Sequence, residues 1–514
     1  MTSAMAGGLA STPTGTTATT TGVTPPVDLA VRRGQRLHPD PTRAVARLFV
    51  PGQGLVAGHE SRASRTIDRV LTLDEAAVEQ ALDDVMRRFA TRHRDLRATF
   101  GRHADRVVER IDSRAELSDN RRQLLGALFT SEYTIEAAAL CNPSIVLHPD
   151  QSSARTGGVR FVMSVRGIGE GHRSTVGFRT GDICADGGVT VDPPGPYPQV
   201  GTVGPGPLHR AIFRGRMCRE CDDGANATVV LECLGDRFSF DDLERGIRKL
   251  RTQSDTRPNA EGTIAQLHAI AACSYTTTFP PVTDVSERVL WPATGVESRG
   301  MEDARFVRFV DEDGTVTYYA GYTAYDGTAI TQQMLETTDF ANFASAPLVG
   351  AAAANKGLAL FPRRIDGRYA ALSRFDEENN AVALSDDVRC WDDAVPIQLP
   401  RQPWETIQLG NCGSPLETDD GWLVLTHGVG PMRTYSIGAL LLDLDDPTRV
   451  IGRLAQPLLS PAVDEQDGYV PNVVYSCGSL VHGENVVIPY AIADTSIGFA
   501  SIRLADLRAA FQKP

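Results

Sequence analysis

The sequence predicts a mainly β protein: a five-bladed β-propeller with an N-terminal helical extension and a helical insertion. Three observations support this fold class. Glycine-containing turn signals followed by strand-like runs recur between residues 157 and 490. Four of these turns are regularly spaced, and helical periodicity is confined to two stretches. We therefore expect a disordered tail at 1–27, a helical extension at 28–140 and a propeller at 141–514, with the insertion at about 185–290.

Composition places the chain among globular proteins and excludes several partners. Of its 514 residues, 42% are hydrophobic and 22% are charged, which excludes a mainly disordered or fibrous protein. Its apolar stretches are far shorter than the roughly 20 residues of a membrane span, so no membrane association is expected. The net charge of −13 argues against nucleic acid as the main partner, because binding phosphate backbones needs a basic face.

Cysteine usage and the N-terminus indicate a reducing compartment. Nine cysteines is an odd number, as expected for reduced thiols, and we expect a cytoplasmic protein. No basic region followed by an apolar core opens the chain, so no secretory signal is expected. Cys218 and Cys221 have CxxC spacing, but no second pair follows, and we expect no metal. The residues of 1–27 are mostly Thr, Ala, Gly, Ser and Pro, which favours disorder.

Two stretches have the period of amphipathic helices. Thr72 and Glu75 have capping-box spacing ahead of apolar positions that recur every three or four residues, from Val78 to Phe89. A second helical run is expected from about Ser118 toward Leu140. The insertion holds two more predicted helices, one beginning near Ser239 and one around residues 264–271. We expect these helices to pack on the propeller or on a second subunit, where they are candidate walls of the ligand pocket, and we expect a homo-oligomer.

A repeat of hairpin turns carries the propeller prediction. The turns stand 53, 54 and 63 residues apart, and a fifth, earlier turn is Gly157-Gly158. Strands are predicted directly after each turn. A period near 50 residues with strand pairs in each unit is typical of a propeller blade. The four spaced turns are Asp313-Gly314, Asp366-Gly367, Asp420-Gly421 and Gly483-Glu484, and the five strands are Val159–Arg166, Val316–Tyr322, Arg368–Arg374, Trp422–His427 and Asn485–Tyr490.

Equivalent positions in the repeats predict two rings of polar residues around one axis. Both rings should face one shared pocket for a polar ligand. The ring that follows the turns comprises Arg166, Tyr322, Arg374, His427 and Asp494, and the ring that precedes them comprises Asn142, Asp303, Lys356, Asn411 and Asn472.

The residue types in these rings suggest chemistry on a sugar. Carboxylates, Asn and Arg beside aromatic rings are what sugar pockets combine. A glycosidase normally needs two carboxylates, an acid and either a base or a nucleophile. When phosphate is the attacking group it brings its own negative charge, so one acid and a set of cations suffice.

A chain of motifs resembles glycoside hydrolase family 130, the inverting β-mannoside phosphorylases and their hydrolase relatives. The segment Gly300–Arg305 resembles the GxEDPR motif of that family. Agreement covers roughly residues 142–182 and 290–505. Further matching segments follow in order: Tyr322–Tyr325, Leu360–Pro362, Gly421–Leu423, His427–Val429, Tyr435, Gly438–Asp443, Pro471–Val474 and Ala493–Thr495.

The resemblance implies a five-bladed propeller and a role for each matching residue. Asp303 would be the single catalytic acid, which in the family protonates the glycosidic oxygen through the 3-hydroxyl of the mannosyl unit. Substrate contacts are implied for Asn142, Arg166 and Asp494, and Tyr322 is expected to join them. Phosphate contacts are implied for Lys356, Arg374, His427 and Tyr435. No cofactor is expected; the partners are a β-mannoside oligosaccharide and inorganic phosphate as co-substrate.

Three departures from the family pattern bear on the activity. Ala304 replaces the proline of the acid motif, and Lys356-Gly357 replaces an Arg-Asn pair. Gln408 stands where the family has a phosphate-contacting lysine. Loss of that lysine should weaken phosphate binding while leaving the other cations in place.

Phosphorolysis of a β-mannoside to α-mannose 1-phosphate is therefore the first functional hypothesis. The alternative is an inverting β-mannosidase on the same fold, which would need a general base. The second alternative is a sugar-binding propeller without catalysis. The candidates for the base are Glu405, Glu417, Asp376 and Glu377.

Overall fold

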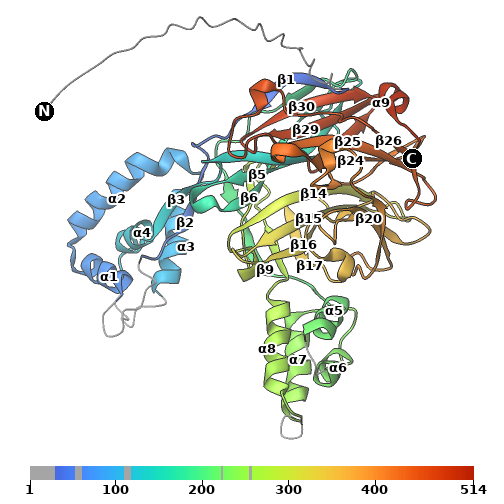
Figure 1. The fold of residues 1–514 in the computed structure, drawn as a ribbon. Helices are drawn as coiled ribbons and strands as arrows, with labels where there is room; N and C mark the ends of the chain where they lie inside the picture. The colour runs from blue at the N-terminus through green and yellow to red at the C-terminus, as the bar shows by residue number, and fades with distance from the viewer. Residues whose placement is uncertain (1–28, 52–60, 109–116, 221–223, 254–256, 514) are drawn as a thin grey trace, which may run out of the picture.

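The protein is described by a computed structural model that covers residues 29–51, 61–108, 117–220, 224–253 and 257–513. The predicted disordered tail at 1–27 lies outside these residues. Strands are the main regular structure of the described chain after residue 130, and two groups of helices lie at its periphery (Figure 1). The prediction of a mainly β protein is confirmed. Within the described residues, no helix is long and apolar enough to cross a membrane.

The strands of the described body fall into five groups in which sequence-adjacent strands pair in antiparallel fashion. The first group is β4 (Ala139–Leu147), β5 (Val159–Ile168), β6 (Ser174–Ile183) and β7 (Val189–Val191). The second is β14 (Gly300–Val310), β15 (Val316–Tyr325), β16 (Ile330–Thr337) and β17 (Asn342–Pro347). The first two groups belong to one 12-stranded sheet, joined where β14 pairs with β6 in parallel at Gly300 and Ser174. The third is β18 (Ala359–Leu360), β19 (Tyr369–Ser373), β20 (Asn380–Ser385) and β21 (Ala394–Gln398).

The fourth group contains β22 (Gln408–Asn411), β23 (Leu416–Thr418), β24 (Gly421–Val429), β25 (Tyr435–Leu442) and β26 (Val450–Arg453). The fifth contains β27 (Val474–Tyr475), β28 (Leu480–His482), β29 (Asn485–Ile492) and β30 (Ser496–Arg503), and helix α9 (Leu504–Ala510) follows it. An N-terminal strand, β1 (Val31–Leu37), pairs with β30, so Val31 faces Ser501 across the ladder. The last group is thus completed by the first described strand of the chain.

The strands that the hairpin repeat predicts are all present. Each turn signal precedes a strand, and β5, β15, β19, β24 and β29 occupy the predicted positions. These strands are largely buried, because each lies inside a sheet whose faces pack against neighbouring groups. Between the first and second groups the packing is aromatic: Phe178 stacks on Phe343 at a centroid distance of 5.7 Å and meets Phe306 edge-on.

The N-terminal extension is only partly helical. Strand β1 opens it, and β2 (Ala44–Leu48) pairs with β3 (Thr130–Thr134) on either side of the helices α1 (Arg62–Thr72), α2 (Glu75–Phe89), α3 (Leu96–Val108) and α4 (Asp119–Leu128). The cap of α2 is Asp74 rather than Thr72, since its carboxylate accepts the Ala77 N–H at 2.7 Å. Ser118 caps α4 as expected, but this helix ends at Leu128 instead of continuing toward Leu140.

A buried ion cluster joins the extension to the strand body. Glu136 accepts hydrogen bonds from Arg43 at 3.1 Å and from Arg179 at 2.6 Å, and all three side chains are buried. Farther out, Arg94 forms an ion pair with Glu287. The extension therefore packs on the body, as the sequence argument expected.

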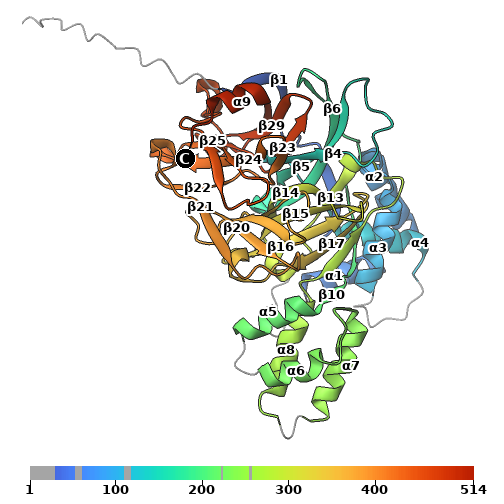
Figure 2. The same cartoon turned by 90° about the vertical axis from the view of Figure 1, so that its right-hand side faces the viewer.

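The insertion forms a second helical lobe, which projects away from the strand body in both views (Figures 1 and 2). Its helices share one apolar core, which also includes Ala346 and Val349 of the body. The predicted helix start at Ser239 is confirmed, because Ser239 and Asp242 form a reciprocal capping box. The helices are α5 (Arg210–Glu220), α6 (Gly224–Leu231), α7 (Phe240–Arg251) and α8 (Ala260–Ala271), and the short strands of this region are β8 (Gln199–Val200), β9 (Thr202–Pro205), β10 (Leu208–His209), β11 (Arg237–Phe238), β12 (Tyr275–Thr278) and β13 (Arg288–Leu290).

Candidate active site

One polar pocket of about 130 Å³ gathers residues from all five strand groups. Eight of the nine residues singled out from the sequence line it: Asn142, Arg166, Asp303, Lys356, Arg374, His427, Tyr435 and Asp494. The remaining lining residues are Glu302, Gln408, Arg433, Val470, Val473 and Tyr475. Within the described residues, none of this lining comes from the helices of either lobe, so the expectation that the helices wall the pocket is not met.

Irregular backbone aims several of these side chains. Strand β14 has a register shift between Glu302 and Arg305, and strand β4 has one between Cys141 and Ser144. The residues inside these bulges, Asp303 and Asn142, have left-handed φ values of 53° and 47°. Asp and Asn tolerate this conformation better than other non-glycine residues, and bulges beside active sites commonly redirect a side chain. The redirected side chains meet, because the Asn142 amide donates to the Asp303 carboxylate.

The acidic side of the pocket is cross-linked by arginines. Arg166 donates to Glu302 Oε1 at 2.5 Å and lies 3.7 Å from Asp303 Oδ1. Arg305, behind the pocket, donates to Tyr475 Oη at 2.7 Å and to the Asp303 backbone oxygen at 2.9 Å. Burial alone would raise the pKa of the Asp303 carboxyl, but Arg305, Arg166 and Lys356, with the Asn142 amide, lower it below its ordinary value. Asp303 is therefore a carboxylate at neutral pH.

The pKa of Asp494 is raised, in contrast to that of Asp303. No described residue donates a hydrogen bond to its carboxyl, and its backbone is left-handed, with φ 48°. Burial raises the pKa of Asp494 to about 6, and although Arg166 lowers it, the negative charge of Asp303 adds to the rise. Two carboxyls in one pocket thus differ in protonation at mildly acidic pH, between about 4 and 6.

This raised pKa predicts a pH dependence of stability. Between pH 3.8 and about 6 the folded protein retains a proton on Asp494 that the unfolded chain has released. The free energy of unfolding of the wild type, relative to Asp494→Asn, should therefore fall as the pH rises through this window. Urea unfolding at several pH values measures the difference. The exposed Asp419→Asn is the control and should show no such slope; a flat difference for Asp494→Asn would contradict the assignment.

The basic side of the pocket is built around a neutral histidine. His427 Nδ1 is 3.1 Å from the Asn411 backbone oxygen, which fixes the proton on Nδ1 and leaves Nε2 to accept from Arg374 Nη1 at 3.3 Å. Burial lowers the pKa of His427 well below its ordinary value, and the charge of Arg374 lowers it further. The arrangement needs glycine at position 410, since a Cβ there would lie 2.6 Å from His427 and 2.7 Å from Arg374.

Arg374 has capacity left for a ligand. It is buried, and its Nε has no hydrogen-bond partner among the described residues. A buried N–H of a cation is stabilised by an acceptor, so this group is available to an anion bound in the pocket. Lys356 lines the same pocket, and Gln408 Nε2 donates to Tyr435 Oη at 3.4 Å.

The assignment of Tyr322 as a substrate contact is wrong. Its side chain is fully buried in strand β15, away from the pocket. The phenol lies between Glu297, to which it donates, and Ser345 Oγ at 2.7 Å. Burial raises its pKa well above the ordinary value, and the charge of Glu297 adds to this. Tyr322 holds the second strand group together and does not reach a ligand.

The four carboxylates named as general bases are also misplaced. Glu405 is fully buried in an ion pair with Arg453, and Glu417 pairs with Arg363 at 2.8 Å. Asp376 accepts hydrogen bonds from its own turn, and Glu377 occupies a left-handed position in that turn. None of the four is among the residues lining the pocket.

The sequence argument missed Glu302, Arg433 and Tyr475. Glu302 directly precedes Asp303 in the acid motif, and Arg433 stands two residues before Tyr435. Both lie inside or beside matching motifs, so a search for every charged residue flanking those motifs would have found them. Tyr475 is buried and carries no such signal, because its position depends on the contact with Arg305.

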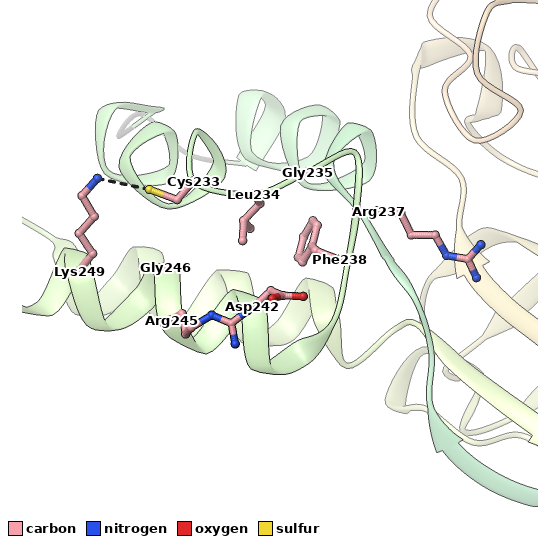
Figure 3. A pocket seen from close by; sticks show the side chains of 9 residues that line it. All are labelled: Cys233, Leu234, Gly235, Arg237, Phe238, Asp242, Arg245, Gly246 and Lys249. Atoms are coloured by element: carbon pink, nitrogen blue, oxygen red, sulfur yellow. Dashed lines mark hydrogen bonds and ion pairs between the residues drawn. The ribbon is translucent and has the colours of Figure 1, made fainter.

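A second cavity, of about 370 Å³, lies in the insertion lobe between α7 and the segment that follows α6 (Figure 3). There Lys249 Nζ donates to Cys233 Sγ at 3.3 Å, and Asp242 is occupied by Ser239 and Arg245. It contains none of the expected site residues. The side chains of the Cys218 and Cys221 pair lie outside the described residues, and no group of metal-ligating side chains occurs among those described.

Comparison with known proteins places residues 281–511 in a family model, Glyco_hydro_130, described as beta-1,4-mannooligosaccharide phosphorylase. A 1,2-beta-oligomannan phosphorylase from a Thermoanaerobacter species is 36% identical over 219 residues, which are 42% of this chain and 72% of the relative. A beta-1,2-mannobiose phosphorylase from Listeria innocua is 31% identical over 226 residues, covering 42% of this chain and 62% of that protein. The solved structure of a Listeria innocua beta-1,2-mannobiose phosphorylase matches 74% of this chain and 92% of its own, at 21% identity and a TM-score of 0.43.

Proposed function

Because this chain belongs to glycoside hydrolase family 130 and is an enzyme of that family, we propose that it catalyses the inverting phosphorolysis of a β-mannoside to α-mannose 1-phosphate. The observation that carries the proposal is the pocket itself. It sets the carboxylate of Asp303 against a group of cationic and neutral donors, among them Arg374, whose buried Nε lacks an acceptor. One acid and an anion site are what phosphorolysis requires.

The role of each side follows from its chemistry. Lys356, Arg374 and Tyr435 would donate to the phosphate, and His427, predicted as a phosphate contact, would act by holding Arg374 through Nε2. Asn142, Arg166 and Asp494 would bind the mannosyl unit. A phosphate oxygen would form the new bond to the anomeric carbon as the bond to the leaving oxygen breaks. Asp303 would supply the proton that the leaving oxygen receives, by way of the 3-hydroxyl of the mannosyl unit.

Phosphate binding would also prepare Asp303 for this role. Arg305, Arg166 and Lys356 lower the pKa of Asp303. A phosphate dianion bound beside Lys356 and Arg374 offsets those charges, so the pKa of Asp303 would rise and the carboxyl would gain its proton. Protonation of the acid would thereby be coupled to the presence of the attacking group.

We further propose that the five strand groups are the blades of a propeller. The opening segments of all five groups line this pocket, and they also line an apolar cavity of about 280 Å³ that has no residue in common with it. Strands that run side by side around one axis would give this pattern. The segments contribute Asn142, Asp303, Lys356, Gln408 and Tyr475 to the first cavity and Ile145, Phe306, Pro362, Leu416 and Leu480 to the second.

A hydrolase is the second candidate, and one observation favours it. Gln408 supplies no charge, whereas Asp494 is a pocket carboxyl without a hydrogen-bond donor among the described residues and with a pKa of about 6. Such a group is suited to accept a proton from water near neutral pH. An inverting hydrolase would then use Asp494 as the base and Asp303 as the acid.

Product analysis separates the two activities. The relatives' names direct the choice of substrates to β-1,2- and β-1,4-linked mannobiose. Each is incubated with the purified protein with and without inorganic phosphate, and mannose and mannose 1-phosphate are quantified. We expect cleavage that depends on phosphate and yields mannose 1-phosphate, with the β-1,2 linkage preferred. Equal cleavage without phosphate, with release of free mannose, would establish the hydrolase instead.

A further inference from the structure

Arg433 lines the pocket without a protein partner. Its side chain is exposed, and no described residue forms a hydrogen bond or an ion pair with its guanidinium. The other pocket arginines differ, since Arg166 is bound to Glu302 and Arg374 contacts His427. A guanidinium at a pocket with all its donors available is suited to bind an anionic ligand.

The turn that carries Arg433 is held in an uncommon conformation. Met432 and Arg433, in the 3-10 turn Pro431–Arg433, both have left-handed φ values, 56° and 55°. Such backbone costs free energy for non-glycine residues and persists where the surroundings impose it. Here Gly430 N–H donates to Thr434 O at 3.0 Å, and Tyr435 N–H donates to Asn472 O at 3.0 Å.

Packing beneath the turn adds a second constraint. Gly430 lies directly on Trp404, so that a Cβ at 430 would be 3.0 Å from the Trp404 Cα. Gly428 and Gly438, on the two flanking strands, approach the ring of the same tryptophan, at 2.6 and 2.5 Å from the position of an added Cβ. The turn is therefore fixed at both ends, and Arg433 is presented to the pocket by a constrained segment.

Arg433 lines the same pocket as Gln408 and Tyr435. Tyr435 follows two residues later and is contacted by Gln408, the amide at the position where the family pattern has a lysine. Arg433 is also close enough to Asp494 for its charge to oppose the rise in the pKa of that carboxyl. Arg433 is thus a cation that shares one pocket with Gln408 and with the carboxyl of Asp494.

We propose that Arg433 is a phosphate-binding residue that supplies the positive charge Gln408 does not provide. Its planar guanidinium would donate two N–H groups to the outer oxygens of the dianion, opposite Arg374 and Lys356. This inference rests on the proposed phosphorolysis. It implies that the protein retains a full set of phosphate cations with one of them relocated to the turn between β24 and β25.

The first test is steady-state kinetics with phosphate as the varied substrate and β-1,2-mannobiose held constant. Arg433→Gln should raise the KM for phosphate by about ten-fold or more, with the KM for the mannoside unchanged. Arg433→Lys should recover part of the loss, because it restores the charge without the planar fork. Arg401→Gln, which removes an exposed arginine outside the pocket, is the matched control and should behave as the wild type. A rise confined to the KM for the mannoside would overturn the proposal.

The second test does not depend on turnover. Calorimetric titration of inorganic phosphate into wild type, Arg433→Gln and the double variant Arg433→Gln/Gln408→Lys measures affinity directly. We expect weaker binding in the single variant and recovery in the double variant. Equal affinities of wild type and Arg433→Gln, or no phosphate binding by the wild type, would refute the role of Arg433. Phosphate binding through Arg433 in a protein that releases free mannose would refute only the proposed phosphorylase activity.

Discussion

Replacement of Asp303 by Asn is expected to reduce turnover by about 10²- to 10⁴-fold, the contribution of general acid catalysis. The amide of asparagine cannot act as an acid. The other pocket carboxyl in the acid motif is Glu302, and it is bound to Arg166. The fold should tolerate the change. Asparagine is accommodated at a φ of 53° as readily as aspartate, and Arg305 retains Tyr475 and the backbone oxygen at 303.

Asp366→Asn is a closely matched control for this experiment. Asp366 also has a left-handed backbone, with φ 48°, but it lies in an exposed hairpin turn outside the pocket. Its variant should retain full activity. The comparison requires initial rates at saturating substrate together with the melting temperature of each protein. If Asp303→Asn keeps near-normal turnover, Asp303 is not the proton donor.

The second large effect is expected at Arg374. Its removal deletes a buried cation whose Nε has no acceptor among the described residues and whose Nη1 contacts His427. Charge-assisted hydrogen bonds contribute about 1.5–3 kcal/mol each, so Arg374→Ala should raise the KM for phosphate by about ten- to a hundred-fold. The KM for the mannoside should change far less. Initial rates over a range of phosphate concentrations give both values.

Arg368→Ala supplies the comparison for Arg374. Arg368 directly precedes strand β19, and Arg374 directly follows it. Arg368 makes an exposed ion pair with Asp386 at 3.4 Å. Loss of a surface pair of this kind has little effect. An equal rise in the KM for both substrates in Arg374→Ala would instead indicate collapse of the pocket, and no rise for phosphate would exclude Arg374 from the anion site.

The strand repeat was predictable because its signals are local. Turns such as Asp313-Gly314 and the alternating strands after them depend on a few adjacent residues, and all five predicted strands are present. The pocket residues were found from ordered motifs. The prediction that Tyr322 contacts the substrate was wrong because its partner Glu297 comes from a separate turn that no periodicity links to β15. The general-base candidates failed for the same reason, since the partners of Glu405 and Glu417 are set by tertiary packing.

Helix boundaries also show where local sequence signals are insufficient. Thr72 and Glu75 satisfied the capping pattern, yet Asp74 is the cap. Thr72 is instead the last residue of α1, where its hydroxyl donates to the Arg69 backbone oxygen at 2.9 Å. After α4, the apolar run toward Leu140 suits a helix or a strand. Thr130–Thr134 forms a strand because it pairs with β2, which lies more than eighty residues earlier in the chain.

The pairing of β1 with β30 constrains how the chain can be made. Val31 is synthesised long before its partner Ser501. The fifth strand group therefore cannot be completed until β30 has been made, and until then the pairing edge of β1 stays exposed. Completion of this group would be a slow step because it closes a loop of several hundred residues. A nascent chain stalled before β30 would hold the other four strand groups with β1 still unpaired.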